Sequence, residues 1–274
     1  MQYHKFDLHM HSNCSDGCDT PEEVVQKCAD AGMQLMALTD HDCTDGVARA
    51  GAAAQERDIR FLPAVEMDCE WPKEVHILGL DLDINHPRLT EALALARDRR
   101  IQRNAGILER LKDAGYDVEP YLKRTPGTVT RMHIGLALVD AGYAKNLAEA
   151  FKQYLRRGCP GFFATPRFAP EEVIDIIRTA GGVPVWAHPF HAGDNTYQLA
   201  DKLVAEGLMG LEAYHPSASS GESDILVSIA RQNKLLITCG SDSHGANRPT
   251  ATIGCTWRKS AELERTFSYF LERT

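Results

Sequence analysis

The sequence lacks a long apolar run, and its start, MQYHKFDLHMH, lacks the short apolar core of a signal peptide. Because a transmembrane helix needs about 20 consecutive apolar residues, we expect a protein that neither spans a membrane nor is exported. A basic excess is also missing, since the formal net charge is −8. A long nucleic-acid groove needs many Lys and Arg side chains on one face. This charge balance argues against such a groove but is compatible with a small phosphorylated substrate.

The eight cysteines include no CxxC pair. In a chain of 274 residues without an export signal, we therefore expect reduced thiols and a cytoplasmic location. Cys14 and Cys18 could bind zinc, but no second pair follows at the spacing of a zinc finger. The composition, 43% hydrophobic and 25% charged, is typical of a globular protein with one large α/β domain, with or without an insertion.

A unit of strand, polar strand end and helix recurs along the chain. After a strand at 6–12, Thr20 would cap a helix, with Pro21 in its first turn, Glu23 completing a capping box and Gly32 ending it. The third and fourth strands are so close in sequence that we expect them to pair. The strand candidates after the first are 35–42, 59–68, 74–82, 181–190, 209–216 and 235–244.

Between Leu89 and about Leu155 only helical patterns occur, and strand patterns return near residue 181. We therefore predict an α/β fold, in which residues 1–87 and 166–274 form a βα barrel or barrel-like sheet. A helical insertion at 88–165 would interrupt it and cover the substrate.

Histidines and carboxylates follow or lie in the predicted strands. In a parallel βα barrel the C-terminal strand ends meet on one face, so residues distant in sequence would share one cleft. A single histidine there is usually hydrogen-bonded or solvated, but seven of the 11 histidines share this placement. Imidazoles and carboxylates without thiolates suit Zn²⁺, Mn²⁺ or Fe²⁺. Because they exceed the needs of one ion, we predict two or three. The candidate ligands are His9, His11, Asp16, His41, Glu66, His76, His188, Asp242 and His244, and His215 follows a strand end without being needed as a ligand.

These motifs resemble those of the PHP (polymerase and histidinol phosphatase) superfamily. The matching residues are HMHS with Asp16, TDHD at 39–42, Glu66 with His76, AHP at 187–189 and GSDSH at 240–244. The resemblance implies a distorted (β/α)7 TIM-like barrel with a trinuclear metal centre. It implies one ion bound by His9, His11, Glu66 and Asp242, a second by Glu66, His76 and His188, and a third by Asp16, His41 and His244.

The run DGCDTPEE and the TRMH motif at 130–133 further resemble stand-alone bacterial PHP phosphoesterases. This implies that a metal-activated hydroxide hydrolyses the 3′-phosphate of nucleoside 3′,5′-bisphosphates such as pAp. A 5′–3′ exonuclease on short 5′-phosphorylated RNA, a histidinol-phosphate-type phosphatase and a metal-binding regulatory module are the alternatives. We expect Mn²⁺ as the metal, with Zn²⁺ or Fe²⁺ as alternatives. The oligomeric state stays open.

Two polar residues beside the predicted ligands could assist the reaction. His215, in EAYHP, is our candidate proton donor and a candidate substrate contact, with a hydrogen-bonded loop histidine as the alternative. Asp40 could orient a ligand imidazole, or be a solvated strand-end carboxylate.

Substrate binding is expected to use the insertion. Arg131 offers a planar fork suited to phosphate, and His133 is a second candidate, although the two would not share a helix face. Arg157 and Arg248 are weaker candidates. The aromatic residues that could stack on a base are Tyr154, Phe162, Phe163 and Phe168, although 162–163 is also expected to pack between insertion and barrel.

Overall fold

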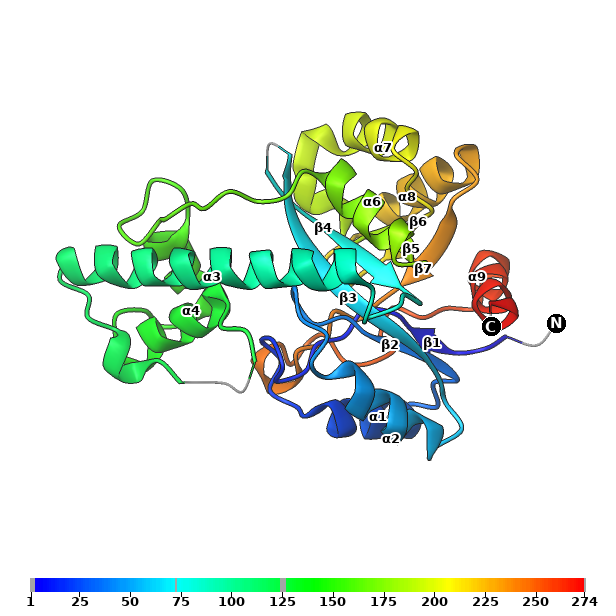
Figure 1. The fold of residues 1–274 in the computed structure, drawn as a ribbon, viewed down its shortest axis with the longest axis horizontal. Coiled ribbons are helices and arrows are strands. Elements are labelled where there is room, and N and C mark those ends of the chain that lie inside the picture. Colours follow the sequence, from blue (N-terminus) through cyan, green and yellow to red (C-terminus); the bar gives the residue numbers. More distant parts are fainter. Residues whose placement is uncertain (1–2, 72, 124–126, 274) are drawn as a thin grey trace.

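The computed structural model describes residues 3–71, 73–123 and 127–273. In these ranges seven strands form one sheet in chain order, surrounded by helices (Figure 1). The sheet nearly closes on itself, because the Leu8 amide donates to the Cys239 carbonyl at 3.2 Å and Met10 bridges Ser243. The predicted seven-stranded barrel is thereby confirmed. The strands are β1 (Phe6–Asp7), β2 (Leu35–Leu38), β3 (Arg60–Trp71), β4 (Lys73–Leu80), β5 (Val183–Trp186), β6 (Gly210–Tyr214) and β7 (Leu236–Cys239).

Strand β4 runs antiparallel to both of its neighbours, β3 and β5, whereas the other neighbouring strands are parallel. The predicted pairing of the third and fourth strands is confirmed, but the assumption of an all-parallel barrel is wrong for β4. A single residue separates β3 from β4, whereas a parallel crossover needs a dozen or more. As a result His76, near the start of β4, lies beside Asp68 of β3. It therefore reaches the barrel end where the other strands finish.

The helices outside the insertion cover the barrel wall (Figure 1). Thr20 caps α1 as predicted: its hydroxyl accepts the Glu23 amide, and the Glu23 carboxylate accepts the Thr20 amide at 2.8 Å. Gly32 follows α1 with a φ of 71°, a conformation that glycine adopts without strain. These helices are α1 (Pro21–Asp30), α2 (Val47–Gln55), α6 (Pro170–Thr179), α7 (Thr196–Ala205), α8 (Ser220–Gln232) and α9 (Ala261–Glu272). The sequence analysis did not identify α7 or α9.

The insertion is helical, and its long helix α3 (Pro87–Asp113) extends from the barrel to α4 (Arg131–Asp140) (Figure 1). Leu89 and Leu93 at the start of α3 belong to the barrel core, whereas Ile107 and Leu111 pack in a second core with α4. One helix therefore joins two hydrophobic cores. Shorter elements complete the insertion: η1 (Glu119–Tyr121), α5 (Leu147–Ala150), the π-helix η2 (Phe151–Leu155) and a final stretch up to α6, which brings Phe168 beside Cys69 of β3.

None of the helices within the described ranges combines the length and the hydropathy that crossing a membrane requires.

Candidate metal centre

The nine predicted metal ligands gather at one end of the barrel. His9 and His11 lie just beyond β1, and both direct Nε2 at the same two carboxylates. Glu66 Oε2 is 3.3 Å from His9 Nε2 and 3.2 Å from His11 Nε2. Asp242 Oδ1 is 3.5 Å from His9 Nε2 and 3.2 Å from His11 Nε2. These four residues therefore surround one point.

The other oxygen of Glu66 serves a second pair of imidazoles. Oε1 lies 2.8 Å from His76 Nδ1 and 3.1 Å from His188 Nε2. Glu66 is 1% exposed, so all of these contacts are shielded from water. The two oxygens of Glu66 thus face different sets of histidines.

Asp16 contacts a third group of histidines. Its Oδ1 lies 3.2 Å from His244 Nε2, and its Oδ2 lies 3.9 Å from His41 Nε2. The other nitrogen of His41 is 3.2 Å from Glu66 Oε2, which links this group to the first two. Thr130, the N-cap of α4 in the insertion, donates its hydroxyl to Asp16 Oδ2 at 3.0 Å. The insertion is therefore hydrogen-bonded directly to the cluster.

Mutual pairing shifts the pKa values of these groups. Burial by itself raises the pKa of the Glu66 carboxyl, but the charges of His41 and His9 outweigh it and hold that pKa well below its usual range. Burial lowers the pKa of His11, yet its contacts with Asp242 and Glu66 raise it overall to about 10. The pKa of His76 is likewise raised, against its burial, by Glu66. The carboxylate of Glu66 and the imidazoles of His11 and His76 therefore stabilise one another's charged forms.

The donor set fits divalent metal ions. Several ligand atoms are buried and have no hydrogen-bond partner among the described residues, although they lie close together: His9 Nε2, His11 Nε2, His41 Nδ1, Glu66 Oε2 and Asp68 Oδ1. Buried polar atoms are normally satisfied, and bound cations would satisfy these atoms. Compact groups able to hold an ion are His9–His11–Glu66, His41–Glu66–His76 and His11–Asp16–His41–His244. This arrangement supports divalent metals but does not fix their number or identity.

Two carboxylates of the site were missed by the sequence analysis. Glu212 on β6 is fully buried, lies 3.0 Å from His9 Nδ1 and accepts the His188 amide at 2.8 Å. Asp68 lies 3.2 Å from His41 Nδ1. Both could have been found, because Glu212 interrupts the apolar run GLEAY and Asp68 follows Glu66 by two residues, on the same face of β3.

Asp40 and His215 lie behind the cluster. Asp40 accepts hydrogen bonds from the Ser12 amide at 2.8 Å and the Ser15 hydroxyl at 2.6 Å, and the Ser15 hydroxyl is 3.5 Å from His11 Nδ1. Asp40 therefore reaches a predicted ligand through a serine. His215 is 3% exposed, accepts the Ser217 amide on Nδ1 and faces Asp242 Oδ2 with Nε2 at 3.2 Å.

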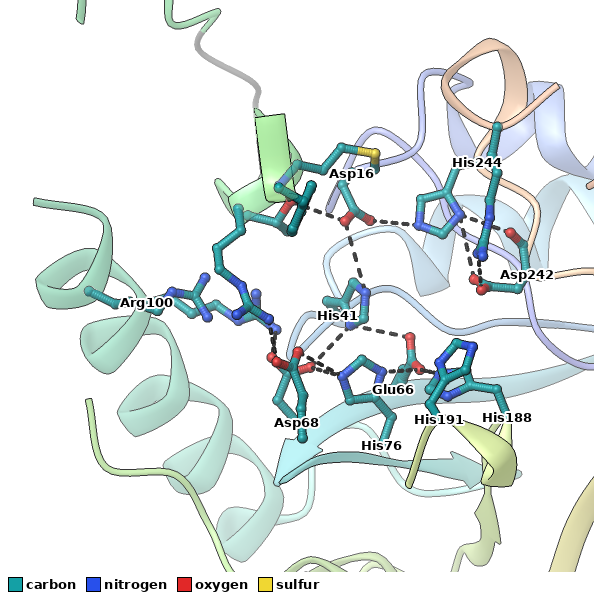
Figure 2. A pocket seen from close by; sticks show the side chains of 17 residues that line it. Asp16, His41, Glu66, Asp68, His76, Arg100, His188, His191, Asp242 and His244 are labelled. Carbon is teal, nitrogen blue, oxygen red and sulfur yellow. Dashed lines mark hydrogen bonds and ion pairs between the residues drawn. The ribbon is translucent and has the colours of Figure 1, made fainter. Parts of the chain in front are cut away.

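A cavity of about 350 Å³ opens above the cluster (Figure 2). His191, which the sequence analysis passed over, lines it together with His188. Arg131, the first residue of α4, lines it too and pairs with Glu74, which also contacts Arg167 at 3.0 Å and His76 Nε2 at 3.1 Å. The remaining arginines around it are Arg100, Arg103 and Arg248. Arg248 pairs with Asp242, whereas Arg157 is 79% exposed and borders a neighbouring cavity.

His133 and the aromatic candidates have packing roles in the insertion. His133 completes the capping box of α4, because its Nδ1 accepts the Thr130 amide at 3.0 Å, and its role as a substrate contact stays a prediction. Tyr154 is buried and donates its hydroxyl to the Tyr143 carbonyl at 2.9 Å. The ring of Phe163 lies so close to Gly106 of α3 that a Cβ there would meet it at 2.5 Å.

The cysteines lie outside the cluster. Cys14 is buried, whereas Cys18 is exposed and accepts the Ala246 amide on its sulfur at 2.9 Å. In the part of the chain that the structure describes, no group of residues able to hold a metal includes a cysteine.

The fold and the site together define a βα-barrel protein with a buried histidine–carboxylate centre that opens into an arginine-lined cavity. The model of the PHP domain family matches residues 7–149. The chain is 35% identical to the 5′-3′ exoribonuclease Rnm of Escherichia coli over 87% of its own length and 85% of the relative. It is also 35% identical to the 3′,5′-nucleoside bisphosphate phosphatase of Chromobacterium violaceum, over 91% and 90%. The chain belongs to the PHP domain family.

Solved structures agree with this assignment. An amidohydrolase from Chromobacterium violaceum, solved with bound sulfate and no metal, matches with a TM-score of 0.87 and 33% identity, over 97% of this chain and 96% of the other. A protein from Bifidobacterium adolescentis, described as a metal-dependent phosphoesterase, matches with a TM-score of 0.84 and 28% identity, over 97% and 96%.

Proposed function

We propose that the protein is a cytoplasmic, metal-dependent phosphoesterase that hydrolyses the 3′-phosphate of nucleoside 3′,5′-bisphosphates such as pAp. One observation carries this proposal: unpaired imidazole and carboxylate atoms lie under a cavity whose wall presents arginines. Such a cavity offers one phosphate a metal centre and a second phosphate a guanidinium. The name of the Chromobacterium violaceum relative supports this choice of substrate. The eight free cysteines support the location.

The proposed ligand sets follow the geometry of the carboxylates. The two oxygens of Glu66 face different histidines, with His76 and His188 at Oε1 and His9, His11 and His41 at Oε2, which favours an ion on either side. The proposed sets are His9, His11, Glu66 and Asp242 for one ion, Glu66, His76 and His188 for a second, and Asp16, His41 and His244 for a third. Bound divalent ions supply Lewis acidity for the phosphoryl oxygens and lower the pKa of water. We propose Mn²⁺ on the resemblance to the family.

We assign phosphate binding and proton donation to side chains beside the proposed ligands. Arg131 would bind a phosphate oxygen after exchanging the carboxylate of Glu74 for it. His215 stays our candidate proton donor: because Nδ1 accepts an amide hydrogen, the neutral ring carries its proton on Nε2, the nitrogen that faces Asp242. It is separated from the cavity by Asp242, so donation would need the substrate oxygen to approach that carboxylate.

The test is release of inorganic phosphate from adenosine 3′,5′-bisphosphate by the Mn²⁺-loaded protein. We expect turnover in the wild type and in a Cys14→Ser control, and loss of about three orders of magnitude in Asp242→Asn, because the amide cannot replace a charged metal ligand. Turnover of histidinol phosphate with none of the bisphosphate would refute the proposal. Metal binding without turnover of either compound would instead indicate a regulatory module.

A second candidate function, 5′–3′ exonuclease activity on short 5′-phosphorylated RNA, is favoured by a separate observation. A further cavity of about 270 Å³ adjoins the first through Glu74, Arg103 and Arg131, and it is bordered by Phe162 and Phe163. It offers room, positive charge and aromatic surface beyond the metal centre. A 5′-phosphorylated trinucleotide tests this activity, because an exonuclease releases mononucleotides from it.

A further inference from the structure

Arg103 is a buried arginine without a charged partner among the residues that the structure describes. It lies on α3 and is 5% exposed. Within the described ranges, no carboxylate lies within 4 Å of its guanidinium, and its Nε has no hydrogen-bond partner. In the described part of the chain its guanidinium makes one side-chain hydrogen bond, a long one from Nη2 to Asn104 Oδ1 at 3.4 Å. Buried charges in proteins are normally paired, so this guanidinium calls for an acceptor that the described part of the chain does not provide.

The neighbouring arginines differ from Arg103 in this respect. Arg100 contacts Asp42 at 2.8 Å and Asp68 at 2.7 Å, so its charge is balanced. Arg131 and Arg167 share the carboxylate of Glu74. Burial, together with the positive charges of Arg100 and Arg131, lowers the pKa of Arg103 to about 9. The surroundings therefore hold an excess of positive charge centred on one guanidinium.

Arg103 also occupies the junction between the two cavities. It lines the cavity above the metal cluster, and it lines the adjoining cavity with Arg131 and Arg167. A ligand whose reacting phosphate lies on the metal cluster could thus extend a second group to Arg103 while staying within the two adjoining cavities. Asp68, which contacts His41 of the cluster, also pairs with Arg100 one helical turn from Arg103. Helix α3 thereby fixes the position of Arg103 relative to the metal cluster.

We infer that Arg103 binds the phosphate of the substrate that does not react, and that it selects compounds with two phosphates over otherwise identical monophosphates. This inference rests on the proposed function, which supplies the reacting phosphate. A phosphate dianion offers the guanidinium both the acceptors and the charge that it lacks, and the planar fork can bind two of its oxygens. Arg131 must first release Glu74 to do the same, so Arg103 is the group already free to bind.

The kinetic test compares adenosine 3′,5′-bisphosphate with adenosine 3′-monophosphate in the Mn²⁺-loaded protein. For Arg103→Gln we expect kcat/KM on the bisphosphate to fall about 10- to 100-fold, mainly through KM, as for a lost hydrogen bond to a charged group. Activity on the monophosphate should change less than about threefold. Arg103→Lys, which keeps the charge but not the fork, should recover part of the loss. Arg88→Gln is the matched control, because Arg88 lies on the same helix and pairs with Asp175 at the surface.

A binding test separates this inference from the proposed function. Calorimetric titration of the Mn²⁺-loaded protein with adenosine 5′-monophosphate should give weaker binding, by about 10-fold, in Arg103→Gln than in the wild type or Arg88→Gln, with adenosine as the uncharged reference. Equal losses on both nucleotides, or unchanged binding in Arg103→Gln and Arg103→Lys, would overturn the inference and leave the phosphatase intact. If the wild type hydrolyses neither nucleotide, the proposed function fails, and the titration alone decides for or against Arg103.

Discussion

At the scale of single residues, Glu212 has the most testable role outside the predicted ligand set. It contacts His9 Nδ1 and the His188 amide from within β6, so it fixes two predicted ligands at once. Carboxylates that hold a ligand imidazole set its tautomer and raise its basicity, and their loss typically lowers metal affinity about 10- to 100-fold. We expect Glu212→Gln to weaken Mn²⁺ binding by that factor.

Titration of chelated protein with Mn²⁺ measures the affinity, and Glu206→Gln, at an exposed position after α7, is the control. An unchanged Mn²⁺ dissociation constant in Glu212→Gln would show that the Glu212 carboxylate has only a packing role.

The raised pKa values of the histidines predict how metal binding depends on pH. In the metal-free protein the pKa of His11 is raised to about 10 and that of His76 lies well above its usual value, so both imidazoles hold protons at neutral pH. An ion must displace those protons. The apparent Mn²⁺ affinity should therefore rise with pH between 6.5 and 8.5, by roughly tenfold per pH unit for each proton released. Calorimetry in buffers of different ionisation enthalpy counts the protons; an affinity independent of pH would contradict the expectation.

Residue types and their positions allowed much of the site to be predicted. All nine predicted ligands lie at one end of the barrel, because alternation along β3 and the ends of the other strands bring them there. Arg103 shows the limit of such reasoning: its sequence context, RRIQRNAG, is that of an ordinary basic helix. Only the folded structure shows that its side chain is buried and that it has no carboxylate partner among the described residues.

At the scale of elements, the start of α4 joins the insertion to the metal centre. Thr130 caps this helix and also donates its hydroxyl to Asp16. We expect Thr130→Val to lower the free energy of unfolding by about 1 kcal/mol through the lost cap and to weaken metal binding, because Asp16 loses its orienting hydrogen bond. Thr130→Ser, which keeps the hydroxyl, should restore both properties.

Ser260→Ala is the control for Thr130→Val, since Ser260 caps α9 by accepting the Leu263 amide. It should cost similar stability in urea denaturation but leave the Mn²⁺ affinity unchanged. If both variants bind Mn²⁺ as the wild type does, the contact of Thr130 with Asp16 has no influence on the centre.

The hydrophobic pattern of the sequence does not predict the direction of β4. An apolar strand reads the same in either direction, so EVHILGLDL predicted a strand but not its orientation. The short connection to β3 decides it. That connection also explains why His76 reaches the cluster from the beginning of β4, whereas Glu66 reaches it from within β3.

At the scale of the whole molecule, the metal centre is expected to stabilise the fold. Its predicted ligands come from segments between residues 9 and 244, so a bound ion would tie together parts of the barrel that are distant in sequence. An ion at about 100 times its dissociation constant adds about 2.7 kcal/mol to the free energy of unfolding. We therefore expect Mn²⁺ to raise the thermal midpoint of chelated wild-type protein, and to raise it less in Asp242→Asn. Equal midpoints with and without Mn²⁺ in the wild type would refute this.

The boundary of the insertion also becomes clear only in the whole molecule. The sequence predicts a helical segment at 88–165, but α3 contributes Leu89 and Leu93 to the barrel core and Ile107 and Leu111 to the second core. A helix shared in this way fixes the cavity between the two cores.

The residue pattern was enough to predict the seven strands, the pairing of the third and fourth, and nine histidines and carboxylates of the site, because these depend on local periodicity and residue chemistry. The tertiary structure alone decided the orientation of β4, the contacts of Glu212 with His9 and His188, and the fact that Arg103, unlike Arg100 and Arg131, has no carboxylate partner among the described residues. Those features arise from contacts between segments far apart in the chain, and burial and charge pairing depend on all the neighbours that folding brings together.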